Sequence, residues 1–574
     1  MRHLLPYIKK YKKETVIAPL FKMLEACFDL LVPLIVADII DNGIGKGDNT
    51  YILLRFGWLV GMAILGLSCT VVAQYFAARA AIGTATGLRH SLIAKIQTLS
   101  FTELDTIGTS TLVTRMTSDV AQVQNGVNMF LRLFLRSPFI VFGAMIMAFV
   151  IDPLIALVFV GAILILFVIV FGMMALTKPR YKRVQNALDR VTGEVRENLG
   201  GVRVIRAFGR EELQENEFRE ANSRLYHAQM KVGRLASLLN PLTYLVINAA
   251  IILILWMGAG RVDGGVLLSG DIIALINYVS QILVELVKLA NTVVLLGKAS
   301  AGISRIGEVL DAESSIKYGD ESLDRESAEA LRFEDVSLRY RGAGDDSLSN
   351  VTFTVMRGET VGIIGGTGSG KSSLVHLIPR FYDATSGEVF LCGKPIRSLS
   401  RDALLSAVAI VDQRPRLFSG TVRENLLWGK GDATDEELWR ALEIAQAADF
   451  IKEKPLGLDE RVSAGGSNFS GGQRQRLTIA RAIVSHADIL ILDDSTSALD
   501  YATDAALRRA LRTLPSYMTV FIVSQRTGSI AYADRILVLE DGELVGMGKH
   551  DALLSTSPVY REIYESQFKK EGEA

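Results

Sequence analysis

Two adjacent carboxylates end the apolar run ILILDD at residues 489–494. The run is all Ile and Leu until Asp493 and Asp494, and small polar residues follow it. A short buried strand of this kind brings carboxylates to the edge of a sheet, where a metal ion or a water molecule can reach them. We expect one carboxylate to hold Mg²⁺ and the other to activate a water. The rest of the sequence bears on whether Asp494 can do the second job.

A glycine-rich segment upstream, ETVGIIGGTGSGKSSLVHLI (359–378), reads as a strand, a turn and a helix. Residues 365–372 match G-x-x-x-x-G-K-[ST] in that context. The glycines let backbone N–H groups surround phosphates at a helix N-terminus. Lys371 would reach the β- and γ-phosphates, and the Ser372 hydroxyl would ligate Mg²⁺. The segment predicts ATP binding by Gly365, Gly366, Thr367, Gly368, Ser369, Gly370, Lys371, Ser372 and Ser373.

The chain of 574 residues is too long for one core, so at least two domains are expected. Its net charge of zero hides an asymmetry between the halves. Residues 1–305 carry 31 Lys and Arg against 21 Asp and Glu, whereas residues 306–574 carry 31 against 41. The three cysteines, Cys27, Cys69 and Cys392, are too widely spaced to predict a disulfide framework or a zinc site.

Six apolar stretches in the first half are long enough to cross a bilayer, which takes about 20 helical residues. LIALVFVGAILILFVIVFGMMAL (154–176) has no charge, which excludes a surface helix of a soluble domain. The sequence therefore predicts a transmembrane domain over residues 15–305. Its spans are expected near 15–41, 53–82, 130–151, 154–177, 236–260 and 271–297.

The charges in the loops predict the orientation of these spans. The loop at 178–235 holds thirteen Lys and Arg residues, whereas the short connections on the other side hold only Lys46 and Arg261. By the positive-inside rule, both termini are cytoplasmic. No cleaved signal peptide is expected. Residues 1–14 mix basic and apolar side chains, which favours an amphipathic helix on the membrane surface, although a disordered basic tail remains an alternative.

Ionisable residues inside the predicted spans mark a candidate cavity, because charges are costly there. Glu25 and Asp29 lie four residues apart on one face of the first span. The sixth span carries Glu285 and Lys288, with Asn277 and Gln281 on the same span. Glu285 and Lys288 either pair with each other or form part of a polar wall along a translocation cavity. In the second case, Glu25 and Asp29 would favour cationic cargo.

The second half of the chain has the pattern of a different kind of domain. After a charged linker at 306–330, residues 331–574 alternate short apolar runs with polar helices, which is typical of α/β domains. NFSGGQRQRLTIARA (468–482), just before ILILDDSTSALD, resembles the signature segment of ATP-binding cassette (ABC) proteins. Six spans followed by one cassette resemble an exporter-type half-transporter. The expected fold is an α-helical six-span transmembrane domain followed by an α/β P-loop ATPase domain.

The resemblance implies roles for residues in the site of this chain. Tyr340 matches the aromatic residue that stacks on adenine. Gln413 matches the glutamine that senses Mg²⁺, and Asp493 with Ser372 completes the expected metal side. Helices near 105–125 and 205–220 resemble the elements that couple the membrane domain to the cassettes.

The resemblance also implies that some residues serve a partner. In the family, the signature closes over ATP held by the other cassette. Phe469 replaces the usual leucine before it. Residues expected to face the partner's ATP are Ser470, Gly471, Gly472, Gln473 and Asp500.

Two positions depart from the family pattern. Asp494 stands where the family has a glutamate that polarises the attacking water, and its carboxylate is withdrawn by about 1.5 Å, one C–C bond. A displacement near 1 Å can cost about 100-fold in rate. Gln525 stands where the family has the switch histidine, and an amide cannot carry a proton. These two residues predict a site that binds ATP well and hydrolyses it badly.

The intact signature beside a weakened site is expected of the degenerate half of a heterodimeric bacterial exporter. The expected cargo is a drug or another amphipathic molecule, moved across a prokaryotic plasma membrane, with no nucleic-acid partner. Alternatives are a lipid or peptide exporter, or an importer of a metal chelate, with the same architecture. A channel-like regulator gated by ATP and a homodimer with two weak sites are further alternatives.

Overall fold

The computed structural model describes residues 2–568, which form two compact units. The first unit comprises residues up to 97 together with 110–311. The second comprises residues 98–109 together with those from 312 onward. The predicted bounds of the N-terminal helix and of the cassette include Met1 and residues 569–574, which lie outside the described residues.

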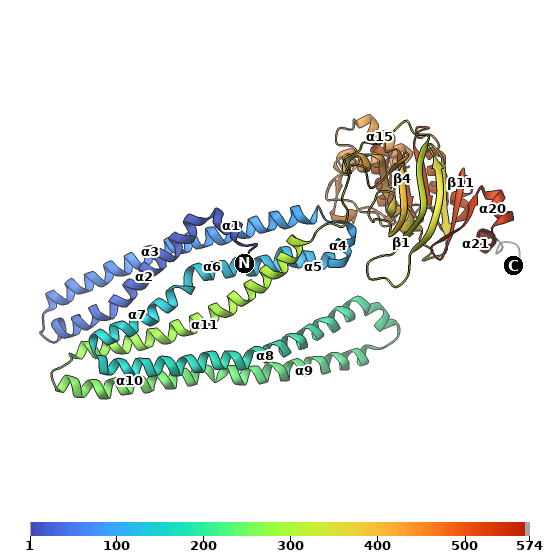
Figure 1. Ribbon diagram of the computed structural model, residues 1–574. Coiled ribbons are helices and arrows are strands. Elements are labelled where there is room, and N and C mark those ends of the chain that lie inside the picture. Colours follow the sequence, from blue (N-terminus) through green and yellow to red (C-terminus); the bar gives the residue numbers. More distant parts are fainter. Residues whose placement is uncertain (1, 569–574) are drawn as a thin grey trace. The chain divides into compact units, whose positions relative to one another are not determined.

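The first unit is entirely helical in its described residues (Figure 1). Its three longest helices are α3, α8 and α11. Helix α3 packs along α2, and α8 runs beside α9 and α10. Its helices are α1 (Leu5–Lys10), α2 (Lys12–Asp38), α3 (Asn49–Ile96), α5 (Thr109–Thr114), α6 (Val120–Met129), α7 (Arg136–Ile151), α8 (Pro153–Ala207), α9 (Glu211–Ser237), α10 (Leu239–Asp263) and α11 (Ser269–Asp311). Three π-helical turns interrupt them: η1 (Ile39–Ile44), η2 (Arg115–Asp119) and η3 (Phe130–Phe134).

Five helical segments within residues 2–568 are long and apolar enough to cross a membrane. Each contains one of the predicted spans from the second to the sixth. The first predicted span lies on α2 and carries four charged residues between 15 and 38: Lys22, Glu25, Asp29 and Asp38. Lys22 Nζ contacts Glu25 Oε2 at 2.5 Å, so part of this charge is paired inside the unit. The prediction of a helical transmembrane region is confirmed.

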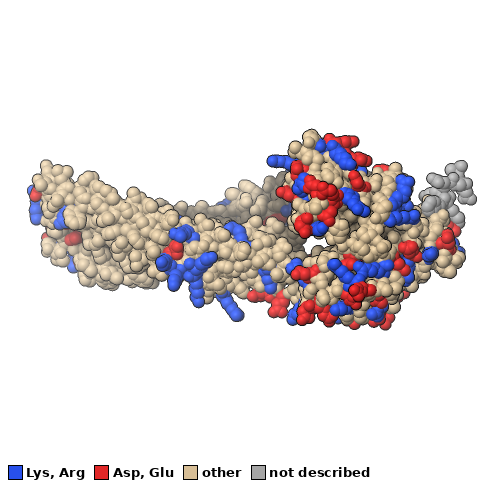
Figure 2. All heavy atoms as spheres, turned by 90° about the horizontal axis from the view of Figure 1, so that it is seen from above, with Lys and Arg blue, Asp and Glu red and all other residues tan. Residues whose placement is uncertain are grey.

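Aspartate caps begin two of the long helices. The Asp48 carboxylate accepts hydrogen bonds from the backbone N–H groups of Thr50 and Tyr51, both at 3.0 Å, at the start of α3. Asp152 does the same for Leu154 at 2.8 Å at the start of α8, where Pro153 occupies the first helical position. Between such ends, charged side chains are sparse over much of the surface of this unit, whereas they crowd the other unit (Figure 2).

Two predicted boundaries differ from the structure. The N-terminal helix α1 ends at Lys10, and Lys12 already begins α2, so the predicted helix over 1–14 is broken at Tyr11. The predicted linker at 306–330 is shorter than expected, because α11 continues to Asp311 and the first strand begins at Glu329. Apolar residues of α11 such as Ile306 and Val309 are buried, which extends the helix past the predicted boundary.

The second unit is an α/β domain with three sheets. The larger sheet has six strands in the order β12-β11-β3-β10-β9-β6, parallel except for the β11–β12 pair. An antiparallel sheet has the order β2-β1-β4-β5, and β7 pairs with β8. The strands are β1 (Glu329–Leu338), β2 (Leu348–Met356), β3 (Thr360–Gly365), β4 (Ser386–Leu391), β5 (Lys394–Pro395), β6 (Val408–Val411), β7 (Gly420–Thr421), β8 (Arg461–Val462), β9 (Ile489–Asp493), β10 (Thr519–Val523), β11 (Arg535–Glu540) and β12 (Glu543–Gly548).

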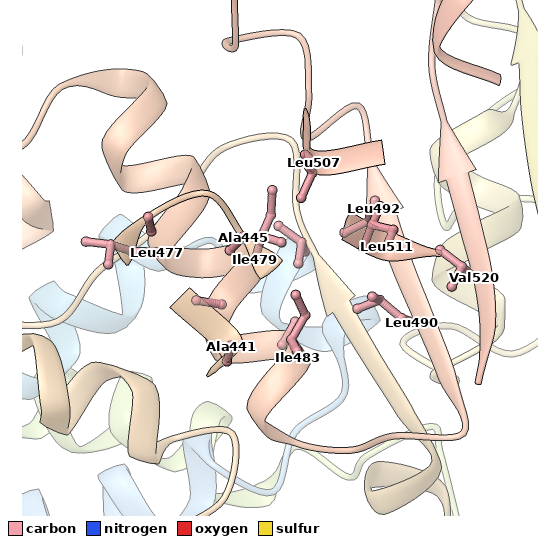
Figure 3. Packing of buried hydrophobic residues seen from close by; sticks show 14 of the residues in the cluster. Ala441, Ala445, Leu477, Ile479, Ile483, Leu490, Leu492, Leu507, Leu511 and Val520 are labelled. Atoms are coloured by element: carbon pink, nitrogen blue, oxygen red, sulfur yellow. The ribbon is translucent and has the colours of Figure 1, made fainter. Parts of the chain in front are cut away.

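Helices cover the six-stranded sheet, and their apolar faces form its core (Figure 3). Leu477, Ile479 and Ile483 of one helix belong to the same buried cluster as Leu490 and Leu492 of β9. All five residues of β9 are buried, which fits a central parallel strand. The helices are α12 (Lys371–Leu377), α13 (Arg401–Ala407), α14 (Val422–Leu427), α15 (Asp435–Ile444), α16 (Ala448–Lys452), α17 (Gly471–Val484), α18 (Tyr501–Leu511), α19 (Thr527–Ile530), α20 (His550–Thr556) and α21 (Pro558–Phe568), with short 3₁₀ turns η4 (Gly457–Asp459) and η5 (Ala464–Gly466).

One helix from the first half of the sequence belongs to the second unit. Helix α4 (Phe101–Ile107) stacks the ring of Phe101 on that of Phe381, with 4.5 Å between ring centroids. The Tyr382 hydroxyl donates to Oδ2 of Asp105 at 2.6 Å. Part of the predicted coupling region at 105–125 therefore packs directly on the cassette.

Candidate functional site

The glycine-rich loop joins β3 to α12 and opens the helix at Lys371. Gly370 takes a left-handed conformation with φ of 93°, and a Cβ there would lie 2.6 Å from the carbonyl oxygen of Ser347. Both facts require glycine at this position. The first backbone N–H groups of α12 have no acceptor within the helix, and such groups at a helix start can bind phosphate.

The side chain of Lys371 folds back over this loop. Its Nζ donates to the carbonyl oxygens of Gly365 at 3.0 Å and Gly366 at 2.5 Å. Burial lowers the pKa of Lys371, and the nearby carboxylates of Asp494 and Asp493 act in the opposite direction. The ammonium is therefore held among acceptors where the β- and γ-phosphates of a nucleotide would replace the carbonyl contacts.

The two carboxylates of the opening run lie at the end of β9, as predicted. Asp493 is 4% exposed and accepts a hydrogen bond from Oγ of Ser372 at 3.2 Å. Asp494 is half-buried and has φ of 45°, a left-handed conformation that aspartate tolerates better than most residues. Burial raises the pKa of both carboxyl groups.

The residues beside Asp493 fit a magnesium ion bound together with ATP. The Ser372 hydroxyl, the Asp493 carboxylate and the Gln413 side-chain amide offer oxygen ligands, which Mg²⁺ prefers. The hydrogen bond between Ser372 and Asp493 puts two of these oxygens in reach of one ion. A bound Mg²⁺ would neutralise charge on the phosphates, while Ser372 and Asp493 hold their oxygens in place.

Gln413 and Gln525 meet Asp494 at one cavity, although they lie far apart in the sequence. The cavity has a volume of about 280 Å³. Gln413 Nε2 donates to Oδ2 of Asp494 at 3.1 Å. The cavity is lined by Ser347, Thr367, Gly368, Gly370, Lys371, Ser372, Ser373, Gln413, Asp493, Asp494, Val523, Ser524 and Gln525. The structure thus brings together the predicted phosphate-binding, metal and degenerate positions.

Tyr340 contacts the helix that follows the phosphate loop. Its hydroxyl donates to Oγ of Ser373 at 3.1 Å. Its ring meets that of Tyr382 edge to face, with 5.0 Å between centroids. An aromatic ring next to the phosphate loop can stack on a nucleotide base. Because Tyr382 also bonds Asp105, a continuous set of contacts runs from this ring to α4.

The signature residues do not line this cavity. Ser470 caps α17: its hydroxyl accepts from the N–H of Gln473 at 3.2 Å, and the Gln473 side chain accepts from the N–H of Ser470 at 2.9 Å. A Cβ on Gly471 would meet nothing within 4 Å, whereas one on Gly472 would lie 3.3 Å from the Ala498 carbonyl oxygen. The N-terminus of α17 is therefore open to another molecule. Phe469, the departure from leucine, is buried and is tolerated there.

Asp500 has a structural task of its own. It caps α18 by accepting from the N–H of Thr503 at 2.9 Å and from the Thr503 hydroxyl at 2.8 Å. Both hydrogen bonds lower the pKa of Asp500, and the one from the Thr503 backbone N–H has the larger effect. The structure does not bring Asp500 to the ATP cavity.

Three residues that line the cavity were not predicted from the sequence, namely Ser347, Val523 and Ser524, and neither was Gln567, which contacts the segment at Gln525. Ser347 lines the cavity and approaches Gly370 through its backbone. Gln567 of α21 donates to the carbonyl oxygen of Gln525 at 2.8 Å and accepts from the N–H of Thr527 at 2.9 Å. The C-terminal helix thus fixes the segment at the switch position. No short motif marks Ser347 or Gln567, because their roles depend on contacts between distant segments.

Inside the first unit, a missed arginine joins the predicted cavity residues. Arg136 donates to Oδ2 of Asp29 and to Oε1 of Glu285, both at 2.7 Å, and is 3.6 Å from Glu25. Lys288 Nζ donates to the same Glu285 oxygen at 2.9 Å, which agrees with the predicted pairing. The sequence does contain a signal for this role, because Arg136 is the second arginine of LRLFLRSPF and lies within the third predicted span.

A cavity of about 450 Å³ lies beside this cluster. Asp29, Arg136, Glu285 and Lys288 line it together with Asn277 and Gln281, so two anions face two cations. Glu25 does not line it and pairs instead with Lys22. Gln281 Nε2 donates to the backbone oxygen of Asp29 at 3.3 Å, while its Oε1 is buried and unpaired within residues 2–568.

Known protein families match both units of the chain. Residues 15–286 match the family described as ABC transporter transmembrane region, and residues 348–497 match the family described as ABC transporter. The chain is 35% identical to the uncharacterized ABC transporter ATP-binding protein YfiB of Bacillus subtilis (strain 168), covering 100% of this chain and 99% of that one. It is 28% identical to the ATP-dependent lipid A-core flippase of Pectobacterium atrosepticum, covering 99% and 97%.

A solved structure shares the fold over nearly the whole length. It is the structure of a bacterial Atm1-family ABC exporter with ATP bound, with a TM-score of 0.79 and 23% sequence identity. The match covers 97% of this chain and 98% of that chain.

Proposed function

Because the chain belongs to the ABC transporter family, with one membrane region followed by one cassette, we propose that it is one subunit of an ATP-driven exporter. It pairs with a second half-transporter and moves amphipathic molecules out of a prokaryotic cell. The observation that carries the finer part of this proposal is the position of Asp494 and Gln525 on one cavity with the phosphate loop.

The ATP site of this chain binds nucleotide and hydrolyses it slowly. Lys371, Ser372 and Asp493 supply the phosphate and metal contacts. Asp494 is too short to hold the attacking water where a glutamate would, and its Oδ2 is engaged by Gln413. Gln525 offers a hydrogen bond without a mobile proton. The loss of a general base costs about 10²–10⁴-fold in rate.

The intact signature implies a partner whose site is complete. Ser470 and Gln473 form a regular capping box, and Gly471 leaves the helix N-terminus open. A helix N-terminus favours an anion through its free N–H groups and dipole. This end of α17 closes over ATP held by the partner's cassette, so turnover occurs mainly at the partner's site. A heterodimer follows, because two copies of this chain would form two weak sites.

The turn between α8 and α9 supports the pairing with a partner. It falls in the predicted coupling region at 205–220. Phe208 is 76% exposed there, and Leu199 and Val204 nearby are also exposed. An apolar cluster at the tip of a charged helical pair indicates a protein contact. We assign this tip to the cassette of the partner.

The charges of the cavity change the expected cargo. Glu25 and Asp29 alone would favour cations, but Arg136 is bonded to Asp29 and Glu285, and Lys288 adds a second cation. The balanced lining and the unpaired oxygen of Gln281 favour cargo with a polar, hydrogen-bonding group over a simple cation. An amphipathic molecule meets this requirement. The lipid A-core flippases among the relatives make a lipid the first cargo to test.

The test is purification of the tagged chain from its native membrane. We expect a second half-transporter to co-purify in equal amount. After incubation with Mg-ATP, photolabelling with an ATP analogue should show intact ATP on this chain and ADP on the partner. Recovery of this chain alone as a homodimer, or equal ADP at both sites through a turnover time course, would refute the heterodimeric degenerate-site proposal.

A further inference from the structure

A second cavity in the first unit differs in chemistry from the polar one. It has a volume of about 560 Å³, within the range of about 300–1,000 Å³ usual for ligand pockets. Its walls come from α1, α2, α3, α6, η3 and α11, and its lining is almost wholly apolar. Leu4 and, from α1, Leu5 and Ile8 line it together with Val127 and Phe130. It shares no lining residue with the polar cavity.

Helix α1 is fixed as one wall of this cavity. The ring of Tyr11 lies against Gly83 and that of Tyr7 against Gly87, so two glycines one turn apart on α3 receive two aromatic rings. At the other end, His3 Nε2 is 3.0 Å from a carboxylate oxygen of Asp311, the last residue of α11. Because α1 spans from α3 to α11, its apolar side covers the cavity.

The cavity contains a buried polar group that lacks a partner among the described residues. Thr84 lines it, is 0% exposed, and its Oγ1 makes no hydrogen bond within residues 2–568. Buried hydroxyls are almost always hydrogen-bonded in native proteins, and an unpaired one costs about 1–3 kcal/mol. An occupant with an acceptor oxygen next to a hydrocarbon chain would satisfy it.

The segment that contains α1 also carries positive charge. Five exposed cations occupy residues 2–13 of the chain: Arg2, Lys9, Lys10, Lys12 and Lys13. An interfacial helix with this pattern attracts anionic lipid headgroups. The wall formed by η3 is π-helical, a local form that often marks functional sites.

We propose that this cavity binds an acyl chain of an anionic phospholipid from the cytoplasmic leaflet. The hydrocarbon chain lies among the apolar walls, an ester carbonyl oxygen accepts a hydrogen bond from Thr84, and the headgroup contacts the cations of α1. This lipid stays bound to the protein and is not its transported cargo. Only the choice of leaflet rests on the orientation in the proposed function.

The experiment uses the full chain in phosphatidylcholine nanodiscs, with a trace of phosphatidylglycerol that carries a diazirine in one acyl chain. After illumination, peptides are mapped by mass spectrometry. We expect adducts on 123–134 and 296–303. Ala80→Phe fills the cavity and should reduce labelling about tenfold, which corresponds to roughly two buried methylene groups. Ile82→Phe, on the same helix but 53% exposed and outside the cavity, is the matched control and should label as the wild type does.

Two further variants leave the cavity volume intact, so they test lipid binding even if Ala80→Phe does not fold. Thr84→Val removes the hydroxyl and should weaken labelling about fivefold. Lys9→Glu with Lys10→Glu should weaken it about tenfold at low salt. Arg203→Glu with Arg206→Glu, the same charge change on exposed positions of α8, should have no effect.

Competition with unlabelled lipids identifies which lipid supplies the bound acyl chain. Unlabelled phosphatidylglycerol should compete, and phosphatidylcholine or free palmitate should compete much less. Equal competition by phosphatidylcholine would refute the role of the headgroup, and equal competition by palmitate would refute a phospholipid occupant. The proposed lipid site would be refuted by unchanged labelling in Ala80→Phe, Thr84→Val and the Lys9→Glu, Lys10→Glu variant. Loss of all labelling once the partner is bound would refute it too. These outcomes are independent of hydrolysis and leave the proposed function untouched.

Discussion

Gln413 donates a hydrogen bond from Nε2 to Oδ2 of Asp494 at 3.1 Å, across 81 positions of sequence. The bond joins the residue expected to sense Mg²⁺ to the residue expected to activate water. It fixes the Asp494 carboxylate toward Gln413 and occupies one of its two oxygens. Together with the short side chain, this contact explains why Asp494 should serve poorly as a base.

Removal of the Asp494 charge should change the activity of the complex only slightly. Asp494→Asn keeps the shape and the left-handed backbone that this position needs, so folding should be preserved. We expect less than about a twofold change in steady-state ATPase activity of the purified complex, because a site without an efficient base contributes little turnover.

Gly471→Asp should act far more strongly than any change at Asp494. A Cβ at Gly471 meets no atom within 4 Å, so the variant should fold. Its carboxylate would repel the γ-phosphate of the partner's ATP and block the free N–H groups of α17. We expect a loss of about 10²-fold or more in ATPase activity. If Asp494→Asn proves as damaging as Gly471→Asp, Asp494 is a working base.

Restoration of the two departures should raise hydrolysis at this site. Asp494→Glu with Gln525→His returns the longer carboxylate and a titratable ring to a cavity whose phosphate loop is intact. The measurement is ATPase activity in a complex whose partner site carries an inactivating substitution, so that only this site reports. We expect a rise of about tenfold or more. No rise would mean that other residues also limit the site.

Lys371→Ala should weaken nucleotide binding without abolishing turnover. The ammonium supplies a charged hydrogen bond, worth about 1.5–3 kcal/mol, to the phosphates. We therefore expect about 10- to 100-fold weaker ATP binding at this site, measured by equilibrium binding with the partner site blocked. Lys371→Arg, which keeps the charge, should lose less affinity. Equal ATP affinity in wild type and Lys371→Ala would contradict the assigned role.

Arg136→Ala should destabilise the membrane unit. The change removes the shared partner of Glu285, whose side chain is 4% exposed, and of Asp29, whose side chain is 43% exposed. Breaking a buried ion pair costs about 3–5 kcal/mol, and the contact with Glu285 is the buried one. Addition of Asp29→Asn and Glu285→Gln should recover most of the loss. Arg132→Ala is the control, since Arg132 donates to the amide of Asn128 at 3.4 Å and not to a carboxylate. Thermal unfolding in detergent measures the stability of each variant. If the triple variant is no more stable than Arg136→Ala, unpaired carboxylates are not the cause of the lost stability.

Tyr382→Phe should loosen α4 from the cassette. Burial raises the pKa of the Tyr382 phenol, so it stays protonated and donates to Asp105 at any physiological pH. Loss of a hydrogen bond to a charged acceptor should speed amide hydrogen exchange in residues 101–107 about tenfold. Tyr501→Phe, at a site 77% exposed, is the control. Unchanged hydrogen exchange in Tyr382→Phe would show that the Phe101–Phe381 contact is enough to hold α4 without the hydrogen bond from Tyr382.

The sequence by itself determined the features that are encoded in short, continuous segments. The phosphate loop at 365–372, the apolar runs and the signature at 470–473 each depend on residues within one turn, strand or helix. Local backbone chemistry and the thickness of a bilayer restrict such segments strongly, so these predictions match the elements in the structure.

Only the tertiary structure decided which distant residues meet. Arg136 lies 107 positions from Asp29 and 149 from Glu285, and its contacts replace the predicted cation-selective pair with a balanced cluster. Gln567 reaches Gln525 from 42 positions away. The apolar cavity under α1 likewise forms where segments separated by hundreds of residues pack together. Such contacts depend on how whole helices pack and on which charges burial forces to pair, and neither is visible in residue spacing.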